Sequence, residues 1–251
     1  MNSKMELQEK ERIEIEFWKN SPSENPSVFT VENFINKNRQ AEILLKKINN
    51  HQLRNRKPKS VLELGAGQGW ASCLMKRFIF PTASFTVTDI SPYAIESIAY
   101  WEKIYQIDIE NKLACRSYEL PFAEQSFDLI FCYAAAHHFV ELEKTLLEIK
   151  RVLNTNGQCI FFYEPTCSKL FYPLHFKYVN GQRPEVPEDV IIPSAVDKIS
   201  KAIGLNYVNH YDHTSQSSAS LAMKIYFSLL NTIPFIKRLL PSSSDLSFRH
   251  Q

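Results

Sequence analysis

The sequence of 251 residues lacks the usual marks of secreted, membrane and zinc-binding proteins. Its five cysteines are odd in number and form no Cys-x-x-Cys pair, so we expect reduced thiols and no metal site. No stretch approaches the roughly 18 uninterrupted apolar residues that a membrane span needs. Residues 1–19 are charged throughout and lack the apolar core of a signal peptide. These absences predict a cytoplasmic protein without a transmembrane segment.

A strong excess of charge is also absent. The formal net charge is +2, which gives no reason to expect a nucleic-acid partner held mainly through phosphate contacts. One stretch differs from the rest, because residues 46–59 hold six basic residues and no acidic one. Such a run is typical of a solvated linker, and an RNA-contacting patch is the alternative. The hydrophobic share of 44% is that of a globular protein long enough to bury a full core.

The pattern of predicted elements changes at residue 60. Two helical segments, 7–19 and 31–49, come before it, and short apolar strands alternate with helices after it. This alternation predicts an α/β fold of the Rossmann-like, doubly wound type, with a mostly parallel seven-stranded sheet and helices on both faces. The predicted strands are 60–64, 84–88, 112–115, 128–134, 159–163, 207–211 and 245–249, and the predicted helices in this part are 70–78, 92–104, 142–153 and 194–203.

Glycine is scarce, yet three of the six glycines lie within five residues, at Gly65, Gly67 and Gly69. They stand at a strand-to-helix turn, where glycine permits positive φ and lets a ligand approach bare backbone. Asp89 closes the next predicted strand, where a doubly wound fold places a carboxylate that accepts ribose hydroxyls. This arrangement serves dinucleotides and S-adenosylmethionine alike.

Two residues indicate which of these two ligands the loop binds. The dinucleotide pattern Gly-x-Gly-x-x-Gly requires a third glycine where this chain has Trp70, which is too large for close helix–strand packing. Glu63 would crowd a pyrophosphate but suits a cationic ligand. The sequence therefore favours S-adenosylmethionine over NAD.

With these features the sequence resembles the class I S-adenosylmethionine-dependent methyltransferases. The resemblance covers about residues 60–162 and implies a methyl-transferring enzyme with S-adenosylmethionine as cofactor and S-adenosylhomocysteine as product. The matching segments, in family order, are Val61–Gly69 (Val-Leu-Glu-Leu-Gly-Ala-Gly-Gln-Gly), Val87–Ser91, Leu120–Ile130, His137–Phe139 and Arg151–Leu153.

The resemblance also implies roles for individual residues. One group would hold the methionine portion of the cofactor, a second the ribose, and a third the adenine. The first group is Glu63, Gly65, Ala66, Gly67 and Gly69; the second is Asp89; the third is Ile90, Ser117 and Tyr118. Tyr133 and Ala134 would offer a carbonyl to the amino group of the cofactor.

The chain departs from the family pattern at two positions. Arg116 stands where such families carry an acid that receives the adenine amino group, so Glu119 or backbone atoms would take over, or adenine recognition is weakened. Ala136 replaces a usual leucine, which predicts a wider pocket mouth.

Methyl transfer from a sulfonium has a neutral leaving group, so alignment supplies most of the acceleration and a base is needed only for a protonated acceptor. The candidate bases are His137, His138 and Glu164, which follow predicted strands at the ligand-binding edge of the sheet. For each, a purely structural role is the alternative. We expect a small-molecule acceptor, such as a sugar or a lipid-linked glycan intermediate. A tRNA base methyltransferase and a non-catalytic cofactor-binding subunit remain alternatives.

We expect two parts, an N-terminal helical extension (1–59) that covers the cofactor site and a methyltransferase domain (60–251). Within the second part, the aromatic and basic insertion 165–193 is expected to be a lid over the acceptor site or a cover for the sheet edge. The apolar segment 218–240 is broken by charges and Pro234, so it cannot span a membrane. Packing over the pocket or a homodimer contact is the leading interpretation, and membrane-surface contact is the alternative.

Overall fold

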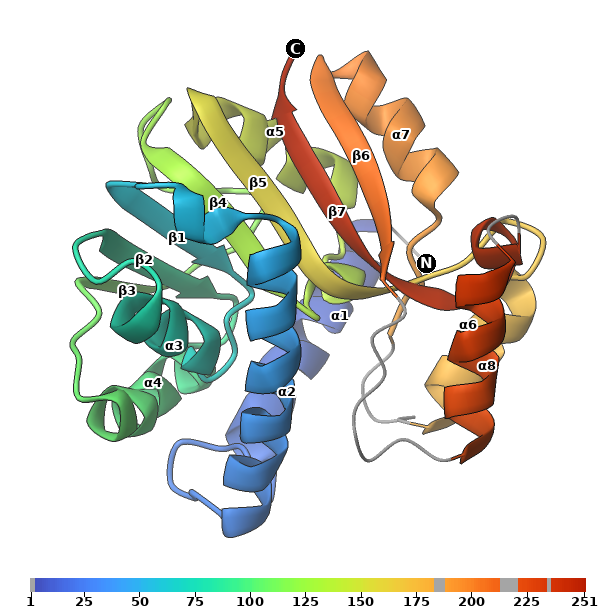
Figure 1. The fold of residues 1–251 in the computed structure, drawn as a ribbon. Coiled ribbons are helices and arrows are strands. Elements are labelled where there is room, and N and C mark those ends of the chain that lie inside the picture. Colours follow the sequence, from blue (N-terminus) through green and yellow to red (C-terminus); the bar gives the residue numbers. More distant parts are fainter. Residues whose placement is uncertain (1–2, 183–187, 213–220, 234–235) are drawn as a thin grey trace.

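A seven-stranded sheet forms the centre of the protein in a computed structural model that describes residues 3–182, 188–212, 221–233 and 236–251 (Figure 1). The strand order is β3-β2-β1-β4-β5-β7-β6, parallel except for β7, which runs antiparallel to both neighbours. The strands are β1 (Ser60–Leu64), β2 (Ser84–Asp89), β3 (Asn111–Ala114), β4 (Phe127–Tyr133), β5 (Leu153–Thr166), β6 (Leu205–Asp212) and β7 (Ser242–His250).

Helices cover both faces of this sheet, as the alternation of the sequence predicts (Figure 1). One hydrophobic core joins the strands to three helices and contains Leu44, Leu74 and Trp101. A second core on the other face contains Leu146 and Val196. The predicted fold class is therefore confirmed. The helices of the first face are α2 (Val31–Asn50), α3 (Trp70–Phe78) and α4 (Pro92–Tyr105), and those of the second are α5 (Leu142–Val152) and α7 (Pro193–Ala202).

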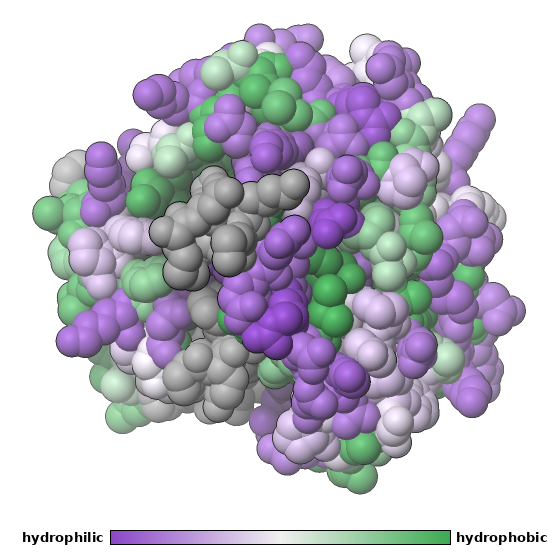
Figure 2. All heavy atoms as spheres, turned by 180° about the vertical axis from the view of Figure 1, so that it is seen from behind, coloured by the Kyte–Doolittle hydropathy of each residue, from purple (hydrophilic) through white to green (hydrophobic). Residues whose placement is uncertain are grey.

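Three more helices lie outside these layers: α1 (Ser3–Asn20), which contacts α4, α6 (Tyr172–Gln182) and α8 (Leu221–Thr232). Helices α6 and α8 fall in the predicted insertion and apolar segment, but residues 183–187, 218–220 and 234–235 of those segments lie outside the described residues. Among the described helices, none is long and apolar enough to cross a bilayer. On the face opposite to that of Figure 1, hydrophilic residues separate smaller hydrophobic patches (Figure 2).

Two predictions about local structure are wrong. The strand predicted at 159–163 is longer in the structure, because β5 begins at Leu153, which already pairs with Phe127 of β4. The basic run 46–59 is not wholly a solvated linker. Lys47 of α2 is fully buried, with its Nζ 2.6 Å from the Asp245 carboxylate of β7, a partner 198 residues away. A distant partner of this kind leaves no signal in the local sequence.

Candidate active site

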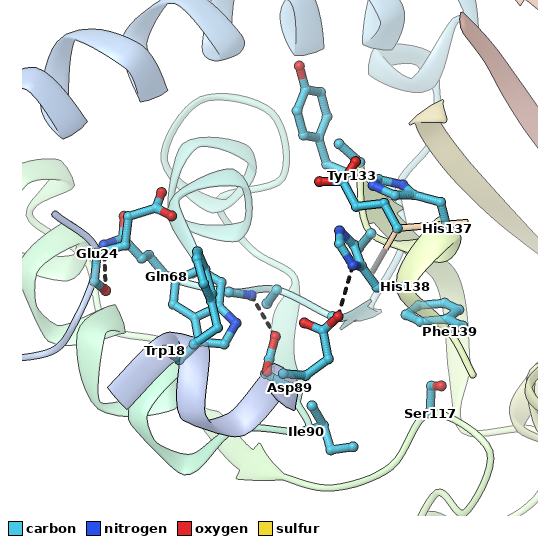
Figure 3. Close-up of a pocket in the computed structure, with 18 of the residues that line it drawn as sticks. Trp18, Glu24, Gln68, Asp89, Ile90, Ser117, Tyr133, His137, His138 and Phe139 are labelled. Carbon is cyan, nitrogen blue, oxygen red and sulfur yellow. Dashed lines mark hydrogen bonds and ion pairs between the residues drawn. The ribbon is translucent and has the colours of Figure 1, made fainter. Parts of the chain in front are cut away.

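A cavity of about 530 Å³ opens where β1, β2 and β4 end, at the carboxyl edge of the sheet. Open α/β sheets bind ligands at this edge, and the volume lies in the usual range for small-molecule sites. Its walls come from the loops after these strands, from α1, α2 and α6, and from the segment before α7 (Figure 3). Residues that line it include Glu11, Glu14, Trp18, Lys37, Gly65, Ala66, Gly67, Gln68, Asp89, Ile90, Ser117, Tyr118, Tyr133, Ala134, His137, His138, Phe139, Tyr178 and Glu188.

The glycine loop turns sharply between β1 and α3. Gly67 has a φ of 53°, a left-handed conformation that glycine adopts without steric cost. A Cβ on Gly67 would lie 2.7 Å from the indole of Trp18, so this glycine also makes room for α1. Gly69 does not line the cavity, and a Cβ there would lie 2.8 Å from Ile98 of α4. The first part of the loop therefore faces the cavity, and Gly69 serves the packing of α3 against α4.

Asp89 ends β2 and is only 6% exposed, yet its carboxylate borders the cavity. Its two oxygens accept the backbone N–H groups of Gly67 at 2.8 Å and of Ser91 at 2.9 Å. A carboxylate has about four acceptor positions, so two remain for a ligand. Burial raises the pKa of Asp89 to about 6, and these two hydrogen bonds oppose that shift.

Glu63 lies beneath the glycine loop and does not line the cavity. It is 2% exposed and accepts the backbone N–H of Ser72 at 3.2 Å. Burial raises its pKa to about 8. Its position beneath the loop supports the first turn of α3, where a helix presents unpaired N–H groups. A direct contact between Glu63 and the methionine portion of a cofactor stays a prediction.

The unusual Arg116 also lies outside the cavity wall. Its guanidinium donates to both carboxylate oxygens of Glu11 in α1, at 2.8 and 3.1 Å. The Tyr118 hydroxyl donates to the same carboxylate. Arg116 thus anchors α1, and the expectation that it weakens adenine recognition stays a prediction.

Ser117, Tyr133 and Ala134 line the cavity from the loops after β3 and β4. Tyr133 packs edge-on against Trp70, with ring centroids 5.1 Å apart. Ala134 has a φ of 48°, unusual for a residue with a Cβ, and its N–H donates to Phe162 at 2.8 Å. Backbone held in such a conformation occurs often at binding sites.

Glu164 organises the opposite end of the cavity from beneath. It is fully buried at the end of β5, and its carboxylate accepts the backbone N–H groups of Ala135 and Ala136, each at 3.0 Å. Its other oxygen lies 2.8 Å from Nδ1 of His137. Burial would raise its pKa, but His137 and these N–H groups hold the pKa below its usual value. Glu164, which the sequence predicted as a candidate base, thus contacts His137 and does not itself line the cavity.

His138 faces the cavity beside His137, with the two ring centroids 4.2 Å apart (Figure 3). Its Nδ1 lies 2.9 Å from the Glu14 carboxylate of α1. Burial alone would lower the pKa of His138, but the hydrogen bond and negative charge of Glu14 raise it above the usual value. The Nδ1 atom of each histidine thus lies within hydrogen-bond distance of a carboxylate.

The acidic residues of α1 were not predicted to reach this part of the cavity, although residues 1–59 were expected to cover the cofactor site. Glu11, Glu14 and Trp18 follow one another at i, i+3 and i+7, so they share a side of the helix. The spacing of these acidic residues along the helix was the sequence feature that could have predicted their place in the cavity.

Comparison with known proteins supplies the class. Residues 62–161 match the family model described as a methyltransferase domain. The uncharacterized methyltransferase YcgJ of Bacillus subtilis (strain 168) is 30% identical over 98 residues, 39% of this chain and 38% of that protein. The phthiotriol/phenolphthiotriol dimycocerosates methyltransferase of Mycobacterium leprae (strain TN) is 28% identical over 103 residues, 41% and 37% of the two chains. The chain thus spans about two fifths of the length of these curated relatives.

A solved structure agrees in fold. Geranyl diphosphate C-methyltransferase from Streptomyces coelicolor A3(2), in complex with Mg²⁺, geranyl diphosphate and S-adenosyl-L-homocysteine, has a TM-score of 0.62 at 12% identity, covering 86% of this chain and 79% of that chain. Residues 62–161 thus match a methyltransferase domain, and the solved structure agrees with it in fold, so both findings support the resemblance to class I S-adenosylmethionine-dependent methyltransferases and the expected cofactor.

The residues present fit that cofactor. Gly65 and Gly67 leave bare backbone on the cavity wall, where added Cβ atoms would meet Phe139 and Trp18 within 3.0 Å. Asp89 supplies a buried carboxylate with acceptor positions to spare, as two ribose hydroxyls require.

Proposed function

We propose that this protein transfers a methyl group from S-adenosylmethionine to an ionisable oxygen of a small-molecule acceptor. One observation carries the proposal: a single cavity is lined by the glycine loop and Asp89 at one end and by His137, backed by buried Glu164, at the other. We call these the donor end and the acceptor end. Holding donor and acceptor in one dry, shaped site supplies the alignment on which an in-line displacement depends.

At the donor end, Asp89 would accept the ribose hydroxyls, while the backbone of Gly65 to Gly67 lies against the methionine portion. Ile90, Ser117 and Tyr118 border the space beside Asp89, where the adenine would lie. Trp18 of α1 covers Gly67 from above, which helps to exclude water from this end.

S-adenosylmethionine supplies an electrophilic methyl group on a sulfonium that leaves as a neutral thioether. At the acceptor end, the Nδ1–H of His137 donates to Glu164, which leaves the Nε2 lone pair as proton acceptor. Nε2 of His137 would take the proton of the acceptor oxygen, which leaves the electron pair of that oxygen free to attack the methyl group that the bound cofactor would supply. Buried Glu164 then stabilises the imidazolium, a role that a carboxylate plays without becoming protonated.

An acceptor with an apolar portion, such as a lipid-linked glycan, is favoured over a plain sugar. Tyr178 and Val179 of α6 bring an aromatic and an aliphatic side chain to the cavity. Leu221, Ile225 and Leu229 expose apolar surface on α8, and contact of this surface with a membrane or a second copy stays a prediction. The curated relative from Mycobacterium leprae is named for dimycocerosate acceptors, which supports the same class.

The two alternatives have less support. A tRNA acceptor would use the basic run 46–59, but Lys47 is buried against Asp245 and cannot reach a phosphate. A non-catalytic subunit was suggested by Arg116, and that side chain anchors α1 through Glu11 instead.

Calorimetric titration of the purified protein with S-adenosylmethionine and S-adenosylhomocysteine, with NAD as control, tests the donor end. We expect binding of both sulfur ligands and none of NAD. Asp89→Ala should weaken their binding by about 1–3 kcal/mol, the cost of leaving buried polar groups unpaired. A screen of glycan and lipid-linked acceptors for S-adenosylhomocysteine release then tests the reaction. Unchanged affinity in Asp89→Ala would show that the donor end is misplaced.

A further inference from the structure

The acceptor end contains a cluster in which two residues, His138 and Glu188, have no role in the proposed methyl transfer. His137, His138 and Glu188 each place one ligand atom so that all three atoms lie within 4.8 Å of one another. The histidines belong to the 3₁₀ turn after β4 (Ala136–His138), and Glu188 comes from the segment between α6 and α7. All three side chains line the same cavity.

The partners of the two histidines are those of metal ligands. His137 has Nδ1 at 2.8 Å from Glu164. His138 has Nδ1 at 2.9 Å from Glu14, and Figure 3 draws this contact as the dashed line that starts at His138. A histidine that donates Nδ1–H to a carboxylate has its lone pair on Nε2. Metal-binding histidines nearly always have their second nitrogen on a carboxylate, a carbonyl or water, which fixes the ring and raises its basicity. Here two adjacent rings are held in this way, each by a different carboxylate.

We propose that His137, His138 and Glu188 bind a divalent transition-metal cation. An ion at the centre of a triangle with 4.8 Å sides lies about 2.8 Å from each corner, against roughly 2.0–2.2 Å for bonds from Zn²⁺ to nitrogen or carboxylate oxygen. Closing the site therefore takes a movement of well under 1 Å by each ligand atom, within the reach of side-chain rotation.

The ligand set and the local charge select the kind of cation. Two imidazoles and one carboxylate suit zinc or ferrous iron, whereas magnesium and calcium prefer oxygen ligands alone. The carboxylates of Glu14 and Glu164 flank the cluster in addition to that of Glu188. A bound cation offsets this concentration of negative charge.

Three protein ligands leave coordination positions open toward the cavity, as in catalytic rather than structural metal sites. An oxygen of the acceptor would take such a position and ionise more easily there, because a bound cation lowers the pKa of a ligating hydroxyl. This last role rests on the proposed function, and metal binding itself does not. One lone pair cannot bind a cation and a proton together, so the metal would replace His137 as the means of ionising the acceptor.

The test is metal binding by the full-length protein in the absence of any methyl donor. Protein stripped with a chelator is titrated calorimetrically with Zn²⁺ and, separately, with Mg²⁺, and Co²⁺ is added to follow its visible absorption. We expect one equivalent of Zn²⁺ with a micromolar or lower Kd, Mg²⁺ binding at least 100-fold weaker, and a Co²⁺ spectrum of nitrogen and oxygen ligands.

Variants separate the cluster from adventitious binding. His138→Ala and Glu188→Gln should weaken Zn²⁺ binding by 100-fold or more, and Glu14→Gln by about 10–100-fold, as for the loss of a carboxylate behind a ligand. His175→Ala, which removes an imidazole of α6 outside the cluster, is the matched control and should bind as the parent does. Thermal melts confirm that each variant is folded.

Zn²⁺ binding that is absent, or that is the same in His138→Ala as in the parent, would overturn the metal site. Zn²⁺ binding without any methyl transfer supports the metal site and counts against the proposed function alone. Methyl transfer that persists unchanged in metal-free protein supports the proposed function and removes the role of the metal in it.

Discussion

The two ends of the cavity are built in different ways. The donor end comes from residues 65–69 and 89–90, two short segments that follow neighbouring parallel strands. The acceptor end joins α1, the turn after β4, the end of β5 and the segment before α7, so that Glu14 meets His138 across 124 positions of sequence. Backbone groups dominate the first end, and ionisable side chains dominate the second.

Because of this difference, we expect cofactor binding to depend on the donor end and methyl transfer to depend on the acceptor end. The donor end depends on backbone geometry, which glycine and the register of β1 and β2 determine locally. The acceptor end depends on carboxylates that hold histidines, and each such pair forms only when distant elements pack. Changes at the acceptor end should therefore alter turnover and stability while cofactor affinity stays constant, and the reverse should hold at the donor end.

The largest expected effect comes from Glu164→Gln. Glutamine removes the charge that holds His137 and places an amide donor against backbone N–H groups of the turn. Loss of one partner of a buried pair costs about 3–5 kcal/mol, so the free energy of unfolding should fall by roughly that amount. Turnover should fall by about 100-fold or more, as for loss of general-base catalysis, while S-adenosylmethionine affinity of the folded protein is kept.

Denaturant melts, steady-state kinetics and calorimetry measure these three quantities. Asp245→Asn is the matched control, because it disrupts the buried pair with Lys47 in the same sheet but outside the cavity. It should lower stability to a similar degree and leave kcat of the folded protein unchanged. Equal loss of kcat in both variants would mean that Glu164 acts through stability alone.

The second prediction concerns the pH dependence of the donor end. Burial raises the pKa of Asp89 to about 6, with Glu14 raising it further and His138 lowering it, and only the ionised carboxylate accepts both ribose hydroxyls. Affinity for S-adenosylhomocysteine should therefore be constant above about pH 7 and fall about tenfold per pH unit well below pH 6.

The free energy of unfolding depends on pH in the opposite direction to cofactor affinity. The folded pKa of Asp89 exceeds its ordinary value of 3.8, so the folded protein holds this proton more tightly than the unfolded chain does. Asp89 therefore costs stability as the pH rises from about 4 to 6. Calorimetry from pH 5 to 8 checks the binding profile, and Asp89→Asn should bind more weakly with a flat profile. A parent profile equally flat across pH 6 would contradict the assignment.

The smallest expected effect is that of Glu11→Gln, which tests how α1 closes both ends. The Glu11–Arg116 pair is half open to solvent on the arginine side, so we expect a loss of no more than about 1 kcal/mol in cofactor affinity. Faster cofactor release in stopped-flow measurements should accompany it. Glu9→Gln on the exposed side of the same helix is the control and should leave release unchanged. Equal release rates in both variants would remove α1 from cofactor retention.

The parts of the fold that were predictable are those with local signals. Helix α3 was predicted with its observed ends, because glycine precedes Trp70 and a parallel strand comes before. Strand β5 was predicted too short, since its first residues gain partners in β4 that no local pattern reveals. The run 46–59 was misread for the same reason, because the charge of Lys47 is paired with Asp245, which is 198 residues away.

The residues of the site also differ in whether local sequence could predict them. Nine of the eleven expected cofactor residues line the cavity, and the two exceptions, Glu63 and Gly69, lie one layer beneath it. Sequence identified His137 and His138 as reactive groups but could not show that Glu164 lies behind one and Glu14 beside the other. It also predicted no metal site, because it considered cysteine pairs and not histidines brought near Glu188 by the chain fold.

The sequence by itself determined the doubly wound sheet, the glycine loop and the carboxylate at the end of β2, since each depends on residues close together in the chain. Only the tertiary structure decided what surrounds the histidines, which helix covers the cavity, and which charges are buried. The physical reason is that burial and pairing set the protonation and orientation of an ionisable side chain, and both depend on elements that meet only in the folded protein.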